Sequence, residues 1–175
     1  MNISFFLRNL TIGIPIVALG IFALGAPEDL NFERYCLFYS LGKIFPVINF
    51  YAEKSAFPSV AKIYFSFAIL LMPLHFLYAY KKLSTPTNDQ WFRNLWFISS
   101  RRVLIKQIIL VVFMLYLLYF LLYINPGFDF KILPINSSRY ALAIGGWIFL
   151  GGIQGVLMAW VLCNLMAFNN FLRRS

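Results

Sequence analysis

Four long stretches without an acidic or basic side chain dominate this sequence. They contain 19, 18, 22 and 33 residues and lie between Arg8 and Glu28, Lys62 and Lys81, Lys106 and Asp129, and Arg139 and Arg173. A helix of roughly 20 apolar residues crosses the hydrocarbon core of a bilayer, which is about 30 Å thick. Only 12% of the 175 residues are charged, against about 25% in soluble domains. The sequence therefore predicts an integral membrane protein.

We expect a single all-α domain of four transmembrane helices, because backbone N–H and C=O groups in lipid must pair within their own segment. Strands of a barrel would alternate apolar and polar residues, whereas these stretches are continuously apolar. The predicted spans are residues 9–27, 63–80, 107–128 and 140–168. They are joined by an outer loop 28–62, a basic cytoplasmic loop 81–106 and a second outer loop 129–139. The third span is almost purely apolar and aromatic, so we expect it to be the most exposed to lipid.

The distribution of Lys and Arg predicts the orientation. The amino terminus, loop 81–106 and the carboxyl terminus carry nine basic residues and one acid, Asp89, whereas the two outer loops carry six basic residues and five acids. Loops rich in Lys and Arg stay on the cytoplasmic side. We therefore expect both termini to be cytoplasmic. Loop 81–106 either only sets this orientation or also contacts anionic lipid headgroups.

The first span has a competing interpretation. Arg8, the apolar run from Leu10 to Leu24 and the small residues Ala23 and Gly25 resemble a secretory signal peptide with its cleavage site. The apolar run is long enough to cross a membrane, which favours a retained helix.

The last uncharged stretch is too long for one membrane crossing, since 33 helical residues would extend roughly 50 Å. Such a stretch must tilt, break or leave the membrane, and we expect it to leave near Asn164. Gly151 and Gly155 form a small-xxx-small pair, and Gln154 beside them can hydrogen-bond across a helix contact. This face either packs against the glycine-bearing first helix or docks another membrane protein.

The first outer loop has the composition of an amphipathic helix at the membrane surface, because aromatic residues alternate with charged ones. We expect that helix to end at Gly42 or Pro46. It either covers the bundle as a lid or offers an outer recognition surface, whose candidate residues are Tyr35, Tyr39, Phe45, Phe50 and Tyr51.

The sequence argues against catalysis and cofactors. All six carboxylates lie in predicted loops, so no acid pair can form at membrane depth. His75 is the only acidic, basic or histidine residue inside a span, and it has no second ligand for a metal or haem. We expect His75 to hydrogen-bond between helices. We therefore predict that the protein is not an enzyme, holds no metal or cofactor and binds no nucleic acid.

Two functions remain, and both require another membrane-inserted protein as partner. The chain is either an accessory subunit of a larger membrane complex or an inhibitor that recognises an invading protein. Its length, its four predicted spans with both ends inside, and a second span running from Ile63-Tyr64 to Tyr80-Lys81-Lys82 before a basic loop favour the second reading. In these features it resembles the immunity proteins that protect bacteria from pore-forming colicins of the colicin A type.

That resemblance covers the topology of the whole chain, but no motif aligns residue by residue, so no functional residue carries over. It implies a multi-pass protein of the bacterial inner membrane. It also implies that the protein meets the toxin's channel-forming helices in the membrane and stops the pore from opening.

The predicted orientation can be tested with reporter fusions. Fusions after Asn88 and after Ser175 should report a cytoplasmic location, and fusions within residues 40–55 an external one, because of the charge distribution. Alkaline phosphatase and a fluorescent protein that matures only in the cytoplasm give opposite readouts. An external carboxyl terminus would contradict the four-span topology.

Overall fold

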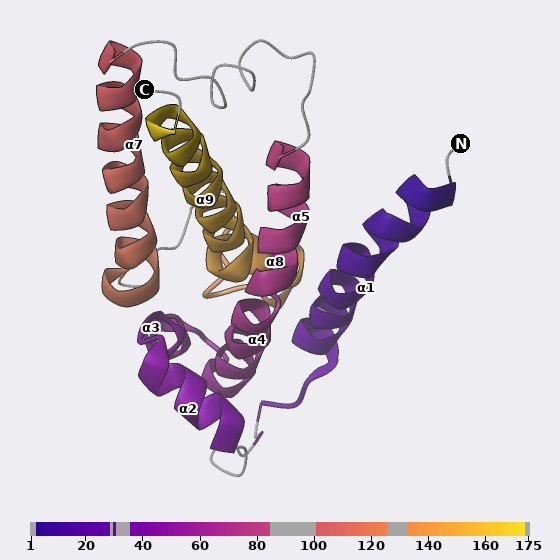
Figure 1. Cartoon of the computed structure of the whole chain (residues 1–175). Coiled ribbons are helices and arrows are strands. Elements are labelled where there is room, and N and C mark those ends of the chain that lie inside the picture. The colour runs from indigo at the N-terminus through magenta and orange to yellow at the C-terminus, as the bar shows by residue number, and fades with distance from the viewer. Residues whose placement is uncertain (1–2, 29, 31–35, 85–100, 126–132, 174–175) are drawn as a thin grey trace.

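The chain is all-helical in a computed structural model that describes residues 3–28, 30, 36–84, 101–125 and 133–173 (Figure 1). These residues contain no strand, which confirms that the fold is all-α. Three helical stretches are long and apolar enough to cross a membrane: Pro58–Ser84, Arg101–Ile124 and Arg139–Leu172. They fit a multi-pass membrane protein. The first predicted span corresponds to α1 (Ile3–Gly25), in which the described apolar part, Gly13–Gly25, is shorter than a crossing.

The remaining helices follow in chain order. They are α2 (Cys36–Ile44), α3 (Val47–Lys54), α4 (Pro58–Leu70), α5 (Met72–Ser84), α7 (Arg101–Tyr119) with a π-helical turn (Phe120–Ile124), α8 (Arg139–Trp147), a second π-helical turn (Ile148–Gly152) and α9 (Ile153–Leu172).

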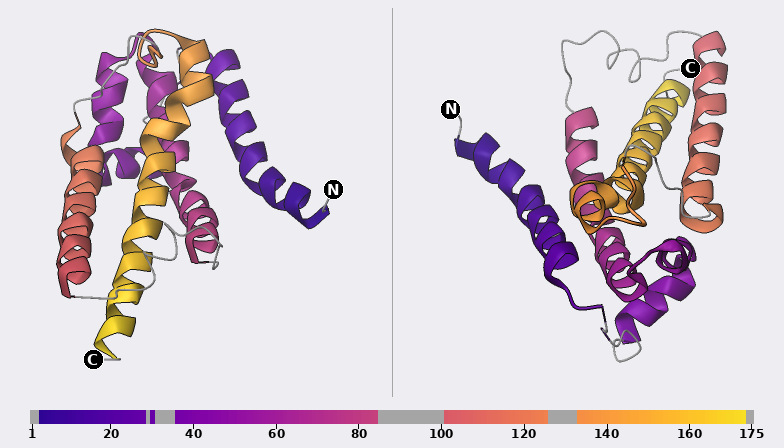
Figure 2. Two further views of the ribbon diagram at one scale, coloured as in Figure 1. Left: turned by 90° about the horizontal axis from the view of Figure 1, so that it is seen from above. Right: turned by 180° about the vertical axis from the view of Figure 1, so that it is seen from behind.

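The helices form a central pair with one flanking helix on each side (Figures 1 and 2). The pair consists of the continuous stretches α4–α5 and α8–α9. On one flank α1 packs against α8 and α4, and on the other α7 packs against α9. The short helices α2 and α3 lie at one end of the bundle, here called the capped end. The start of α1 and the end of α9 lie at the other, here called the splayed end (Figure 1).

The hydrophobic core is concentrated at the capped end. Its large, fully buried side chains include Ile48, Tyr51, Tyr64, Phe65 and Leu142. Toward the splayed end, α5 buries only His75 and Ala79, and α7 buries none of its residues. The third predicted span is thus the least buried of the three membrane-length stretches, as expected from its composition. The helices are held together at one end and separate toward the other.

The second membrane-length stretch begins and ends beyond its predicted limits, at Pro58 and Ser84. Pro58 occupies the first turn of α4, where a proline's missing N–H costs nothing. The stretch is interrupted at Leu71 between α4 and α5. Pro73 follows two residues later and cannot donate to the hydrogen-bond ladder, which explains the interruption.

The fourth stretch breaks inside the bundle, whereas the sequence led us to expect that it leaves the membrane near Asn164. It runs on to Leu172, but Leu150 is extended and Gly151 has a φ of 108°. L-residues with a side chain rarely adopt this left-handed region, whereas glycine does so freely. The residues Leu150 and Gly151 therefore divide the span into two helical halves.

The outer loop holds two short helices instead of the single one expected. The first, α2, ends at Ile44 before Pro46, within the predicted limits. The second, α3, starts directly after Pro46, which takes the N-cap position. A proline stops the helix before it because it cannot donate an N–H, and the same property lets it start a new one.

Replacing Gly151 with alanine should destabilise the protein by roughly 2 kcal/mol or more, because a non-glycine residue is strained at this φ. The added Cβ would also overlap the backbone carbonyl oxygen of Ala68. Gly25→Ala is the matched control, since its Cβ would have no atom within 4 Å. Thermal unfolding of both purified variants in detergent measures the effect, and equal melting temperatures would contradict this account of the break.

Candidate functional site

The predicted packing face of Gly151 and Gly155 is occupied by the chain's own second membrane-length stretch. Gly151 lies against the Ala68 carbonyl of α4. A Cβ on Gly155 would stand 2.7 Å from the His75 Cβ and 2.9 Å from the backbone of Met72 and Phe76, all in α5. The expected partner, the first helix, instead places Gly20 near Ala143 of α8. The glycines lie on the inner side of the α8–α9 stretch, so their neighbours are α4 and α5.

Gln154 does not hydrogen-bond across a helix contact, as the sequence analysis expected, but within its own segment. Its side-chain oxygen accepts from the Gly151 N–H at 2.7 Å, and its side-chain amide donates to the Phe149 carbonyl at 2.8 Å. As in half of a capping box, a side chain in the first turn of a helix binds a backbone N–H three residues earlier, although Gly151 here precedes the N-cap residue Gly152. The break leaves the Gly151 N–H and the Phe149 carbonyl without partners in the helical ladder, and the Gln154 side chain binds both.

The aromatic residues proposed as an outer recognition surface do not form one surface. Tyr51 is 1% exposed and stacks obliquely on Phe65, with ring centroids 4.7 Å apart. Phe45 and Phe50 are half-buried, whereas Tyr39 is exposed beneath the Lys43 ammonium. Tyr35 lies outside the described residues. The sequence could not show that α3 turns one face inward, so that Tyr51 belongs to the core of the capped end and not to an outer surface.

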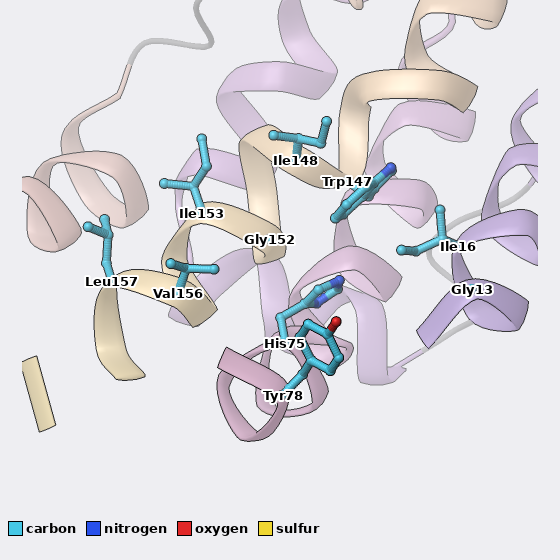
Figure 3. Close-up of a pocket in the computed structure, with 10 residues that line it drawn as sticks. All are labelled: Gly13, Ile16, His75, Tyr78, Trp147, Ile148, Gly152, Ile153, Val156 and Leu157. Atoms are coloured by element: carbon cyan, nitrogen blue, oxygen red, sulfur yellow. The ribbon is translucent and has the colours of Figure 1, made fainter. Parts of the chain in front are cut away.

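His75 lies beside a cavity of about 570 Å³ between α1, α5 and the break in α8–α9 (Figure 3). Its imidazole stacks on the indole of Trp147, with ring centroids 5.3 Å apart, and its Nδ1 lies 2.9 Å from the carbonyl oxygen of Leu71, the residue between α4 and α5. The expected hydrogen bond to a neighbouring helix is therefore replaced by a bond within the α4–α5 stretch. The contact between helices is the ring stack. Other lining residues are Gly13, Ile16, Tyr78, Ile148, Gly152, Ile153, Val156 and Leu157.

The least buried helix, α7, carries an exposed stripe that sequence analysis did not single out. The stripe, called the α7 stripe below, consists of Ile105, Ile109, Val112, Tyr116, Tyr119 and Tyr123. Their spacing of three and four residues places them on one side of the helix. The rings of Tyr119 and Tyr123 stack at 5.3 Å. The spacing was visible in the sequence, but which face of α7 meets α9 is decided only by the fold.

Among the residues that the structure describes, no group of three His, Cys, Asp or Glu side chains could hold a metal ion. The polar groups at membrane depth are instead hydroxyls, amides and one imidazole, whose chemistry is hydrogen bonding. No protein family model matches this chain, and no curated protein or solved structure does so either. The function is therefore inferred from the chemistry of these residues.

Replacing Gln154 with leucine should destabilise the protein by roughly 1–3 kcal/mol, because the buried Gly151 N–H then loses its acceptor. Gln154→Glu keeps that acceptor, and as a buried neutral acid it can also donate to the Phe149 carbonyl, so it should retain more stability than the leucine variant. Hydrogen exchange at the Gly151 amide, followed by mass spectrometry of the 147–157 region, should accelerate in the leucine variant. Unchanged exchange there would mean that the amide is protected by packing alone.

Proposed function

We propose that the protein is a non-enzymatic membrane protein that binds another membrane-inserted protein by helix–helix contacts. The observation that carries the proposal is the pair of exposed tyrosines in the last turn of α7, within the membrane-length stretch Arg101–Ile124. Tyr116 is 60% exposed and Tyr119 is 53% exposed. Neither hydroxyl is hydrogen-bonded within the described residues. Lipid can cover their rings but offers no partner for their hydroxyls.

The depth of Tyr116 makes an ordinary interfacial role for it unfavourable. Ten residues separate it from Lys106 and nine from Asn125, which at 1.5 Å per residue is about 15 Å and about 13 Å along the helix. Side chains of a helix also tilt toward its N-terminus, so the Tyr116 hydroxyl points away from the nearer end of the span. A polar group at this depth is costly unless a neighbouring helix hydrogen-bonds with it.

We further propose that this partner is a pore-forming bacteriocin of the colicin A type and that the protein acts as an immunity protein in the bacterial inner membrane. The resemblance in length and span arrangement supports this reading. So does the arrangement of the ends, because the start of α1 and the end of α9 lie at the same end of the bundle (Figure 1). Both termini would then be cytoplasmic, with α2 and α3 on the outer side.

The exposed basic residues at the splayed end support the same orientation. Lys81, Lys82, Arg101, Arg102, Lys106 and Arg173 are all exposed and lie at the ends of α5, α7 and α9. Cytoplasmic leaflets are negatively charged, and each basic residue near the surface adds about 1 kcal/mol of attraction. We propose that these residues contact anionic headgroups.

The alternative is an accessory or assembly subunit of a larger membrane complex. The same α7 stripe would then pack permanently against a neighbouring subunit. This reading predicts a partner that co-purifies in mild detergent from the native membrane in a fixed ratio, in the absence of any toxin. An immunity protein would purify without such a partner.

Cells that express the protein should survive a pore-forming bacteriocin that kills the parent strain, and Tyr116→Phe combined with Tyr119→Phe should weaken this protection. Each lost hydrogen bond in a membrane is worth about 0.6 kcal/mol and at most about 2. The dose that kills half of the cells should therefore fall roughly three- to tenfold.

Tyr140→Phe is the matched control, because Tyr140 is also highly exposed but lies on α8 at the capped end, away from α7. It should protect like the wild type, with equal amounts of each variant in the membrane. Full protection by the double variant would contradict the role of α7. Failure of the wild type against every member of a panel of such toxins would remove the immunity reading.

A further inference from the structure

The cavity beside His75 has the size and lining of a site for a small lipid-soluble molecule. Its volume of about 570 Å³ lies within the range of roughly 300–1,000 Å³ that is typical of ligand pockets. A spanning helix about 10 Å wide and 30 Å long would fill several times this volume. Aliphatic and aromatic side chains from α1, α5, α8 and α9 line it, as Figure 3 shows. The cavity therefore suits a hydrocarbon group, and it is too small for a partner's transmembrane helix.

One buried polar atom in its wall has no partner. His75 is 7% exposed, and its Nε2 is buried without a hydrogen-bond partner. The state of this nitrogen follows from the other side of the ring. A carbonyl oxygen only accepts, so Nδ1 donates its hydrogen to the Leu71 oxygen. In the neutral imidazole the proton is then on Nδ1, and Nε2 is left as a hydrogen-bond acceptor.

An unsatisfied buried acceptor is costly, and such groups are rare in native proteins. The group that would satisfy it must be a donor. Figure 3 shows the imidazole extending from α5 into the space between Trp147 and the part of α1 that carries Gly13 and Ile16. Nε2 is itself covered in this arrangement, so a donor in the cavity reaches it only when the surrounding side chains move apart.

The wall on the α1 side can yield to an incoming group. A Cβ on Gly13 would meet no atom within 4 Å. The contacts that fasten α1 lie at the capped end, where the Arg139 guanidinium donates to the Ala26 carbonyl at 2.6 Å and pairs with Glu28 at 3.2 Å. The part of α1 beside the cavity can therefore shift without breaking these contacts.

We propose that the cavity binds a single-chain amphiphile ending in a hydroxyl group, taken up from the lipid phase. The hydrocarbon chain lies between α1 and α9, against Ile16, Ile153 and Val156. The hydroxyl donates its hydrogen to Nε2 of His75, which completes the hydrogen bonding of the imidazole. This inference is separate from the partner contact proposed for α7, because the two sites share no residue.

Photolabelling with a matched pair of probes tests the proposal. Hexadecanol carrying a diazirine on its chain can donate a hydrogen bond, whereas the methyl ether of the same compound cannot. In the purified full-length protein, the alcohol should label residues 147–157 several-fold more than the ether does. In His75→Phe, which retains an aromatic ring beside Trp147 but has no acceptor, both probes should label equally. Equal labelling of the wild type would overturn the proposal, because the cavity would then hold lipid chains without recognising a hydroxyl.

A second variant keeps the test decisive if His75→Phe does not fold. Gly13→Phe places a ring in the cavity and should reduce labelling by both probes, whereas Gly25→Phe, also free of neighbours within 4 Å, should not. Unchanged labelling in Gly13→Phe would place the binding site elsewhere. Competition by dioleoylglycerol but not by unlabelled hexadecanol would overturn the single-chain part of the proposal. Neither glycine variant alters the α7 stripe, so probe binding and toxin protection are measured independently.

Discussion

A backbone group in the hydrocarbon core must find its partner within the protein, and the break at Leu150 and Gly151 is where this requirement is hardest to meet. The α8–α9 stretch passes so close to α4 that only a glycine fits against the Ala68 carbonyl. The positive φ of Gly151 interrupts the hydrogen-bond ladder. Gln154 resolves the conflict by binding the Gly151 N–H and the Phe149 carbonyl. Without this cap the central pair could not pack as closely as it does.

The splayed end is open because the large side chains lie at the capped end and because a glycine sets the close contact between α9 and α5. Large side chains of α3, α4 and α8 fill the capped end, and Gly155 brings α9 directly onto the backbone of α5. The flanking helices are attached mainly to this central pair, α1 to α8 and α4 and α7 to α9. Toward the splayed end α1 draws away from α9, which leaves the cavity beside α1, whereas α7 stays beside α9 and exposes the stripe on its other side (Figure 1). Both candidate sites arise from a bundle that is tight at one end only.

The two candidate sites are distinguished by the polar group that each leaves available. On α7, Tyr116 and Tyr119 are exposed to the surroundings of the described helices. Beside α1, the buried Nε2 of His75 lies next to a cavity of about 570 Å³. Apolar surface is no more stable against protein than against lipid, so recognition within a bilayer depends on close packing and hydrogen bonds. The two proposals therefore concern different classes of molecule, a transmembrane helix at α7 and a small amphiphile beside His75.

The sequence by itself determined the class of fold, because intervals without charge and the need to pair every backbone group leave only membrane helices. Its composition also indicated that α7 would be the least buried span, and Pro46 marked the end of α2.

The contacts of individual residues inside the bundle depended on the tertiary structure. Gly151 and Gly155 read equally well as an inner or an outer face until α4 and α5 were seen to occupy it. Tyr51 reads as a surface aromatic until α3 turns it against Phe65. Gln154 and His75 were recognised as polar groups within the predicted spans, but they bind backbone groups of the residues just before their own helices and no neighbouring helix. The break at Gly151 and the interruption at Leu71 leave those backbone groups available. Periodicity shows which residues share a face, and only the packing of the other helices decides what that face meets.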